Sequence, residues 1–191
     1  MTTVAHFARR HARSRRLRQL AIICASLLLG VVGTGGTPLA GAQSGGYAPG
    51  FDVRGLVDHP AHLTRPDLQR YPPSTAHVTF LAGKASMHAT YTGVLLWTLL
   101  NAAGVQTNTL RKNDMLSKYV VVTGSDGYQA VIALAEILPD YGHQQILVAY
   151  QHDAAPLGAD EGMARLVVPQ DKRGGRYVDN IVRIEMRTAG T

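Results

Sequence analysis

The sequence has almost no cysteine: Cys24 is the only one among 191 residues. Residues 43–191 contain none, so this part of the chain can form no internal disulfide, offer no thiolate to a metal and use no cysteine nucleophile. Common catalytic motifs are also missing. No glycine-rich dinucleotide or P-loop pattern follows a predicted strand, and there is no Gly-x-Ser-x-Gly nucleophile turn.

The first 42 residues have no acidic side chain. Their arginines precede an apolar run over 20–32, and small residues follow as far as Ala42. This order predicts an export signal over 1–42 that is cleaved after Ala42, and therefore a periplasmic or secreted protein. The apolar run is too short, and too soon interrupted by glycine and proline, to predict a membrane span.

The export route stays open between the general secretory and twin-arginine pathways. Arg15-Arg16 resembles the start of a twin-arginine signal, but Arg18 and Gln19 stand where that motif prefers apolar residues. Cys24 lies early in the apolar run and not after small residues at its end, which argues against lipidation.

The surplus positive charge lies entirely in the predicted signal. The whole chain carries a net charge of +6, and residues 1–42 hold six arginines. The 149 residues after them have 13 Lys and Arg against 13 Asp and Glu. Net charge therefore predicts binding to neither nucleic acid nor an anionic membrane, and the length suits one domain.

Residues 43–76 are rich in glycine and proline, with only a brief apolar patch over 51–57, so we expect an irregular lead segment. His59 and His62 stand three apart beside Asp58, a spacing that can suit a metal. Without a third ligand we interpret them as surface histidines, and the sequence predicts no metal site.

Short apolar runs rich in β-branched residues predict most of the remaining fold. We expect strands over 77–83, 118–124, 128–134, 146–150, 165–168 and 181–187. Residues 84–90 form a short polar stretch with no assigned element. In 181–187 the alternation is only approximate, because Ile181 falls on the polar side.

One stretch has helical spacing. Leu95, Leu96, Leu99, Leu100 and Ala103 form an apolar stripe, and Gly104 is a natural residue to follow a helix. Trp97 lies off the stripe and is interpreted as packing at its edge.

Turn residues complete the prediction. Asp126-Gly127 between two strand-like runs predicts a hairpin, with the Asp126 side chain bonding the backbone two residues on. Residues 135–138 form a helical turn that Pro139 stops. The sum predicts a mixed, largely antiparallel α+β domain over 77–191 with one main helix.

Between the last two predicted strands lies a basic loop, with Lys172, Arg173 and Arg176 around Gly174-Gly175. Glycine allows close backbone approach to a ligand, and the three cations could hold a phosphate. The alternative is a solvated hairpin tip, the commoner fate of a charged loop.

Several short motifs occur in one order: Tyr91-Thr92-Gly93-Val94, Tyr119-Val120-Val121, Asp126-Gly127-Tyr128, Leu147-Val148-Ala149-Tyr150, Pro156-Leu157 and Arg165-Leu166-Val167-Val168-Pro169. This succession, over about 77–187, resembles the molybdopterin-binding domain of the sulfite oxidase family of oxidoreductases. The resemblance implies a mixed α+β fold and a molybdopterin cofactor. By this resemblance, Arg165 would lie beside the cofactor. The loop with Lys172, Arg173 and Arg176 would hold the cofactor's phosphate.

Two departures from the family pattern bear on function. Family enzymes bind molybdenum through a cysteine between the early strand and the helix, but here that interval is Lys84–Tyr91 and has no cysteine. Ser86, Met87 or His88 would make a different site. Acids Asp160 and Glu161 precede Arg165, where the family usually has a histidine, and like charge disfavours an anionic cofactor there.

We therefore expect an exported, non-catalytic member of this fold that binds a small anionic ligand or a redox partner. The alternative is a molybdopterin-dependent oxidoreductase, acting on a small oxyanion or sulfoxide, with a non-cysteine ligand such as His88 or Ser86. The sequence identifies no catalytic residue and names no partner protein.

Overall fold

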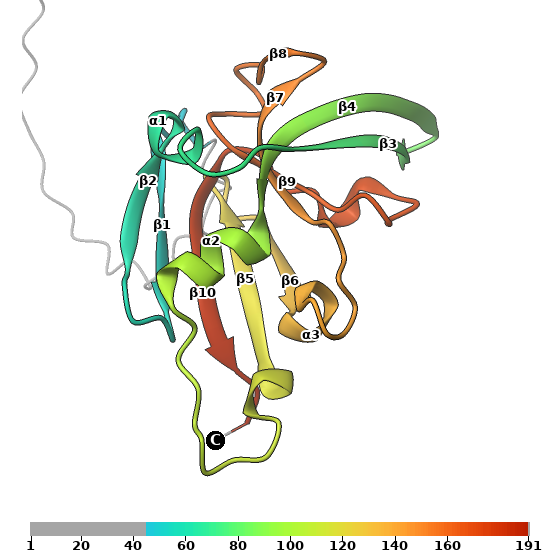
Figure 1. Ribbon diagram of the computed structural model, residues 1–191. Helices are drawn as coiled ribbons and strands as arrows, with labels where there is room; N and C mark the ends of the chain where they lie inside the picture. Colours follow the sequence, from blue (N-terminus) through green and yellow to red (C-terminus); the bar gives the residue numbers. More distant parts are fainter. Residues whose placement is uncertain (1–44, 191) are drawn as a thin grey trace, which may run out of the picture. The chain divides into compact units, whose positions relative to one another are not determined.

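The computed structural model describes residues 45–190, so the predicted export signal and Cys24 lie outside the described residues. One sheet has the strand order β2-β1-β10-β5-β6 (Figure 1). Its strands are β1 (Gly50–Gly55), β2 (Ala61–Thr64), β5 (Lys118–Gly124), β6 (Gln129–Ala133) and β10 (Ile181–Thr188).

The second sheet has the order β3-β4-β7-β8, and β9 also pairs with β7. Its strands are β3 (Ser74–Ala82), β4 (Ala85–Leu95), β7 (Leu147–His152), β8 (Ala155–Pro156) and β9 (Arg165–Val167). Among the named strands only β1 and β10 pair in parallel, and the other pairs are antiparallel. The prediction of a mixed, largely antiparallel α+β fold is confirmed.

Helices are few and short. They are α1 (Arg65–Leu68), α2 (Leu96–Ala103) and α3 (Leu134–Ile137), with 3-10 turns η1 (Asp114–Ser117) and η2 (Gly174–Arg176). The main helix was predicted as α2, which ends at Gly104 with a φ of 72°. Within 45–190 no helix is long and apolar enough to cross a membrane.

The core joins both sheets to α2. The helix buries Leu96, Leu99, Leu100 and Ala103 among strand residues such as Val120 and Ile184. Trp97 is only partly buried at the margin of this core, as predicted. The Asp126 turn is also confirmed, because its Oδ1 accepts a hydrogen bond from the Tyr128 amide at 2.9 Å.

The prediction of an irregular lead segment is wrong for residues 50–68, which form β1, β2 and α1. Phe51 and Val53 are buried while Asp52 between them is exposed, the alternation of a half-buried strand. Three residues of alternation were too few to stand out from the surrounding glycine and proline.

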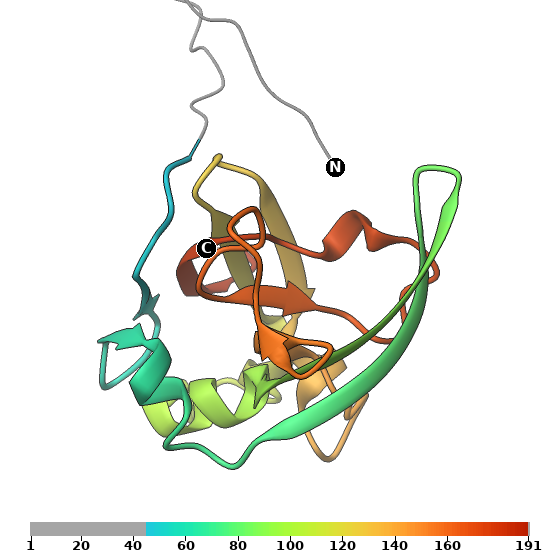
Figure 2. The same cartoon turned by 90° about the horizontal axis from the view of Figure 1, so that it is seen from above.

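Residues 85–90, for which the sequence predicts no element, are the first part of β4, which pairs with β3 from Ala82↔Ala85 to Ser74↔Gly93. The two strands form a long curved hairpin that extends away from the rest of the domain (Figure 2). We call it the hairpin arm. Its polar sequence reflects exposure, because most side chains of β4 before Tyr91 are exposed or half-buried.

A β-bulge explains the imperfect alternation in β10. The register between β10 and β5 shifts between Ile181 and Arg183. An extra residue in one strand changes which side chains face the core. Ile181 and Ile184 are therefore both buried, although a regular strand would place them on opposite faces.

Candidate functional site

The basic loop folds back against the tip of the hairpin arm. The Leu81 amide donates to the Lys172 carbonyl oxygen at 3.0 Å, and Leu81 and Arg173 form a parallel bridge. From the turn that precedes β6, the Tyr128 hydroxyl donates to the Gly175 carbonyl oxygen at 2.5 Å. The loop is therefore held in place from two sides, unlike a free hairpin tip.

Arg176 is neutralised by acids. Its guanidinium donates two hydrogen bonds to Asp171, at 2.8 and 2.7 Å, and one to Glu136 at 2.9 Å. The hydrogen bonds to Asp171, followed by those to Glu136, raise the pKa of Arg176. Arg176 thus ties the basic loop to α3.

Arg165 is also held by acids. Its side chain, only 14% exposed, is hydrogen-bonded to Glu161, and its Nε lies 3.0 Å from Asp179 Oδ1 without an aligned hydrogen bond. The guanidinium carbon stands 5.3 Å from the centre of the Tyr91 ring and 5.5 Å from that of Tyr177, within cation–π range.

Glu161 is the centre of this buried polar cluster. It accepts a hydrogen bond from the Tyr91 hydroxyl at 3.2 Å and lies 3.1 Å from His152 Nδ1, and the His152 ring stacks on Tyr91. Burial alone would raise the pKa of Glu161, but hydrogen bonds from His152 and Arg165 outweigh it and lower the pKa. Glu161 is therefore an internal anion that compensates Arg165.

A groove lies between the hairpin tip and the basic loop, with a volume of about 400 Å³. We call it the basic groove; it is lined by Phe80, Leu81, Ala82, Gly83, Arg165, Arg173, Gly174, Gly175, Tyr177 and Asp179. The Phe80 and Tyr177 rings, 4.5 Å apart between centres, supply an aromatic surface beside the two cations.

The structure does not bring the four predicted cations to one point. Arg165 and Arg173 line the basic groove, whereas Lys172, Arg173 and Arg176 line a neighbouring cavity of about 370 Å³ with Asp171 and Gly175. Lys172 and Arg173 are exposed, and neither forms an ion pair with any residue of the described chain. Arg173 alone lines both cavities with an uncompensated charge.

The sequence did not single out Tyr177, which lines the basic groove. The residue is 5% exposed, and its buried hydroxyl has no hydrogen-bond partner within residues 45–190. Burial raises the pKa of Tyr177 to about 12. Its hydroxyl is therefore a neutral, unsatisfied donor beside the groove. Only its position just after the basic loop could have drawn attention to it.

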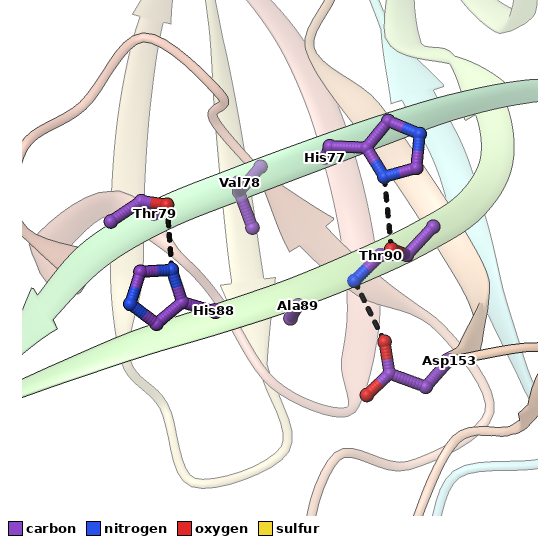
Figure 3. Close-up of a pocket in the computed structure, with 7 residues that line it drawn as sticks. All are labelled: His77, Val78, Thr79, His88, Ala89, Thr90 and Asp153. Carbon is purple, nitrogen blue, oxygen red and sulfur yellow. Dashed lines mark hydrogen bonds between the residues drawn. The ribbon is translucent and has the colours of Figure 1, made fainter.

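His88 belongs to another cavity, of about 320 Å³, on the hairpin arm (Figure 3). There His77 is hydrogen-bonded to Thr90, and His88 to Thr79, each at 3.0 Å. Thr79 and Phe80 are neighbours in β3, so their side chains point to opposite faces. His88 therefore lies on the face of the arm away from Phe80 and the basic groove.

The residues present do not fit the metal part of a molybdenum cofactor. Residues 43–191 contain no cysteine, and the interval in which a thiolate ligand would stand is the paired hairpin arm. Within 45–190 no three His, Cys, Asp or Glu side chains are grouped to hold a metal ion. His59 and His62 are exposed, and His62 pairs with Asp52 at 2.7 Å.

Comparison with known proteins agrees with the fold. Residues 50–190 match the family model described as the oxidoreductase molybdopterin binding domain. The crystal structure of the sulfane dehydrogenase SoxCD from Paracoccus pantotrophus superposes with a TM-score of 0.58 at 21% sequence identity, covering 74% of this chain and 39% of that one. This chain thus spans well under half the length of that enzyme chain.

Among curated proteins, no significant match is found. The family match begins at residue 50 and so includes β1, β2 and α1, which precede the domain predicted over 77–191. Because it extends over most of the chain, the protein belongs to the oxidoreductase molybdopterin-binding domain family, with the fold of the sulfite oxidase family.

Proposed function

We propose that this protein is an exported, non-catalytic member of its family and that the basic groove binds a small anionic ligand. The observation that carries the proposal is the pairing of Arg173, a cation with no acidic partner in the described chain, with the buried, unpartnered hydroxyl of Tyr177. Both residues line the groove, and a guanidinium and a phenol hydroxyl are donors suited to a phosphate or carboxylate.

The groove is also ready for a ligand before one binds. The basic loop is fixed by Leu81 and Tyr128, and Arg176 anchors it to Glu136. A ligand therefore need not order the loop, which lowers the entropic cost of binding. At Gly175 an added Cβ would meet no atom within 4 Å, so the groove is open at this backbone position.

Arg165 has a different role in this proposal. Glu161 and Asp179 already compensate its charge, and their carboxylates would repel a highly charged ligand that came close. We therefore assign the attraction of the anion to Arg173, with Lys172 beside it, and the shape of the groove to Arg165.

Thermal unfolding in phosphate and in chloride at matched ionic strength tests the groove. Phosphate at a hundredfold excess over Kd should stabilise the protein by about 2.7 kcal/mol, because it binds only the folded state. Arg173→Ala should abolish the difference between the two salts. Lys112→Ala, which removes an exposed cation outside the groove, should leave it unchanged.

Equal stability of the unaltered protein in phosphate and in chloride would refute an inorganic anion site. If Arg173→Ala were still more stable in phosphate than in chloride, phosphate would bind at another site on the molecule.

The alternative is a molybdopterin-dependent oxidoreductase with His88 or Ser86 as metal ligand, and the geometry favours it less. Neither Ser86 nor His88 lines the basic groove, and His88 pairs with Thr79, which alternates with the groove-lining Phe80. A metal held by His88 would lie on the opposite face of the hairpin arm from Phe80 and the basic groove.

A further inference from the structure

We propose that a second cavity, built around Trp97 and separate from the basic groove, binds a small aromatic carboxylate. Its volume is about 540 Å³, larger than that of the basic groove and within the range of small-molecule sites. It lies where the loop after α2 meets η1 and the turn after α3. The residues that line it are Trp97, Thr107, Asn108, Thr109, Arg111, Asn113, Asp114, Met115, Leu116, Leu138, Pro139, Asp140 and Tyr141.

The cavity presents an aromatic and apolar surface. Trp97 and Met115 pack one side against the core and are only partly buried, while Leu116 and Tyr141 are 38% and 55% exposed. The turn that carries Tyr141 is held by hydrogen bonds from the Tyr141 amide to Leu138 and from the Gly142 amide to Ala135. A flat apolar ligand would remove this surface from water without rebuilding the backbone.

Asp114, one of the lining residues, belongs to a buried ion pair. Asp114 and Lys118 are 2.7 Å apart, with side chains about 6% and 5% exposed. Asp114 also accepts the Asn108 amide at 2.8 Å, and Asn108 Oδ1 accepts the Leu110 amide at 3.0 Å. The Asn108 amide and then Lys118 lower the pKa of Asp114. The loop is therefore fixed in place, and the charge of Asp114 is already compensated.

The remaining charges at the rim favour a carboxylate. Arg111 is exposed and has no ion-pair partner among residues 45–190. Asp140 also lines the cavity, so the ligand's carboxylate should face Arg111 and turn away from Asp140. The side-chain amides of Asn108 and Asn113 add uncharged donors nearby. An aromatic ring with one carboxylate matches this combination.

The chain provides its own reporter, because Trp97 is its only tryptophan. Titration of the full exported protein with 4-nitrobenzoate, an aromatic carboxylate that quenches indole fluorescence, should give a saturable loss of Trp97 emission. The same titration of free tryptophan amide measures the loss of emission that is due only to light absorption by the ligand, and this loss is subtracted. The neutral analogue 4-nitrobenzyl alcohol should bind about tenfold more weakly, since it cannot pair with Arg111.

Two variants make the test specific. Arg111→Gln should weaken 4-nitrobenzoate binding about tenfold and bring it close to that of the alcohol. Arg173→Ala, in the basic groove, should leave it unchanged, and inorganic phosphate should not compete.

Non-saturable quenching, or equal affinity for acid and alcohol, would refute a carboxylate site at Arg111. Loss of binding in Arg173→Ala would place the ligand in the basic groove. Since phosphate binding at the groove is measured separately, failure of either proposal leaves the other standing.

Discussion

The charge of Arg165 is compensated by acids of the protein itself, although the residue stands at the family position beside the cofactor. Family resemblance sets it beside an anionic cofactor, but here Glu161 and Asp179 compensate its guanidinium inside the protein. From the sequence alone, the acids before Arg165 predict repulsion of an anionic cofactor. The structure adds that Glu161 is the direct partner of Arg165 and of His152.

Replacing Glu161 by Gln should make the protein less stable at neutral pH by about 2–4 kcal/mol, because Arg165 loses a buried partner. The folded-state pKa of Glu161 lies below its ordinary value of 4.5. Its stabilisation is therefore complete above that pH and is lost as pH falls through the lower, folded-state value. Urea unfolding of both proteins at neutral pH and about one unit below 4.5 measures this, and the gap between them should narrow in acid. A constant gap would contradict the assignment.

Arg176 was predicted from sequence to hold a ligand phosphate, and its ion pairs with Asp171 and Glu136 now favour a structural part. Arg176→Ala should cost about 1 kcal/mol of unfolding free energy, since the pairs are partly exposed. The double variant with Asp171→Asn should cost little more than either single change. Phosphate should still stabilise Arg176→Ala. If Arg176→Ala removed the stabilisation by phosphate but did not lower the free energy of unfolding, Arg176 would be a ligand-binding residue and not a structural one.

At the level of elements, the hairpin arm determines what the site can be. Its second strand occupies the interval in which family enzymes carry the cysteine ligand, and its tip forms one wall of the basic groove. The arm joins the rest of its sheet where β4 pairs with β7, and the register of this pair shifts between Thr92 and Gly93. A Cβ at Gly93 would lie 2.3 Å from the Val148 carbonyl oxygen. This close approach explains the glycine of the Tyr-Thr-Gly-Val motif.

Gly93→Ala should therefore reduce the free energy of unfolding by about 3 kcal/mol, because backbone atoms must move to accept the methyl group. Gly175→Ala is the matched control, since a Cβ there meets nothing within 4 Å and its φ is not positive. Chemical denaturation measures the free energy of unfolding of both variants, and only Gly93→Ala should show the large loss. Equal stability would mean that β4 and β7 can separate at no cost at this point.

The elements that the sequence predicted well are those whose signal is local. The 118–134 hairpin follows from Asp126-Gly127, and α2 from its apolar stripe and Gly104. Strand β4 escaped prediction because its exposed side chains carry no apolar alternation before Tyr91. β1 escaped because its alternation is short and lies among glycine and proline, and because one of its two partners, β10, is at the far end of the described chain.

The candidate site was predicted only in part for the same reason. The basic loop is continuous in sequence, so its cations could be found by reading along it. Which of them keep a free charge depends on distant acids, such as Glu136 for Arg176. The contribution of Phe80 and Tyr177 to one groove depends on the docking of the loop onto the hairpin arm, which no local pattern encodes.

For the whole molecule, the fold is that of the family, but the residue that binds the metal in family enzymes is missing. The family match and the superposition on the SoxCD chain establish the molybdopterin-binding fold, and the match covers 39% of the SoxCD chain. Arg173, a cation without an acidic partner among residues 45–190, lines the basic groove, and residues 43–191 offer no thiolate for a metal. We propose that this fold is used here for anion binding without molybdenum chemistry.

The measurement that tests this claim most directly is the metal and pterin content of the protein purified from a molybdenum-replete host. Elemental analysis should find molybdenum far below one atom per chain, and release under denaturing conditions should yield no stoichiometric pterin. About one molybdenum per chain, together with pterin, would contradict the account and make this protein a molybdenum enzyme with a non-cysteine ligand.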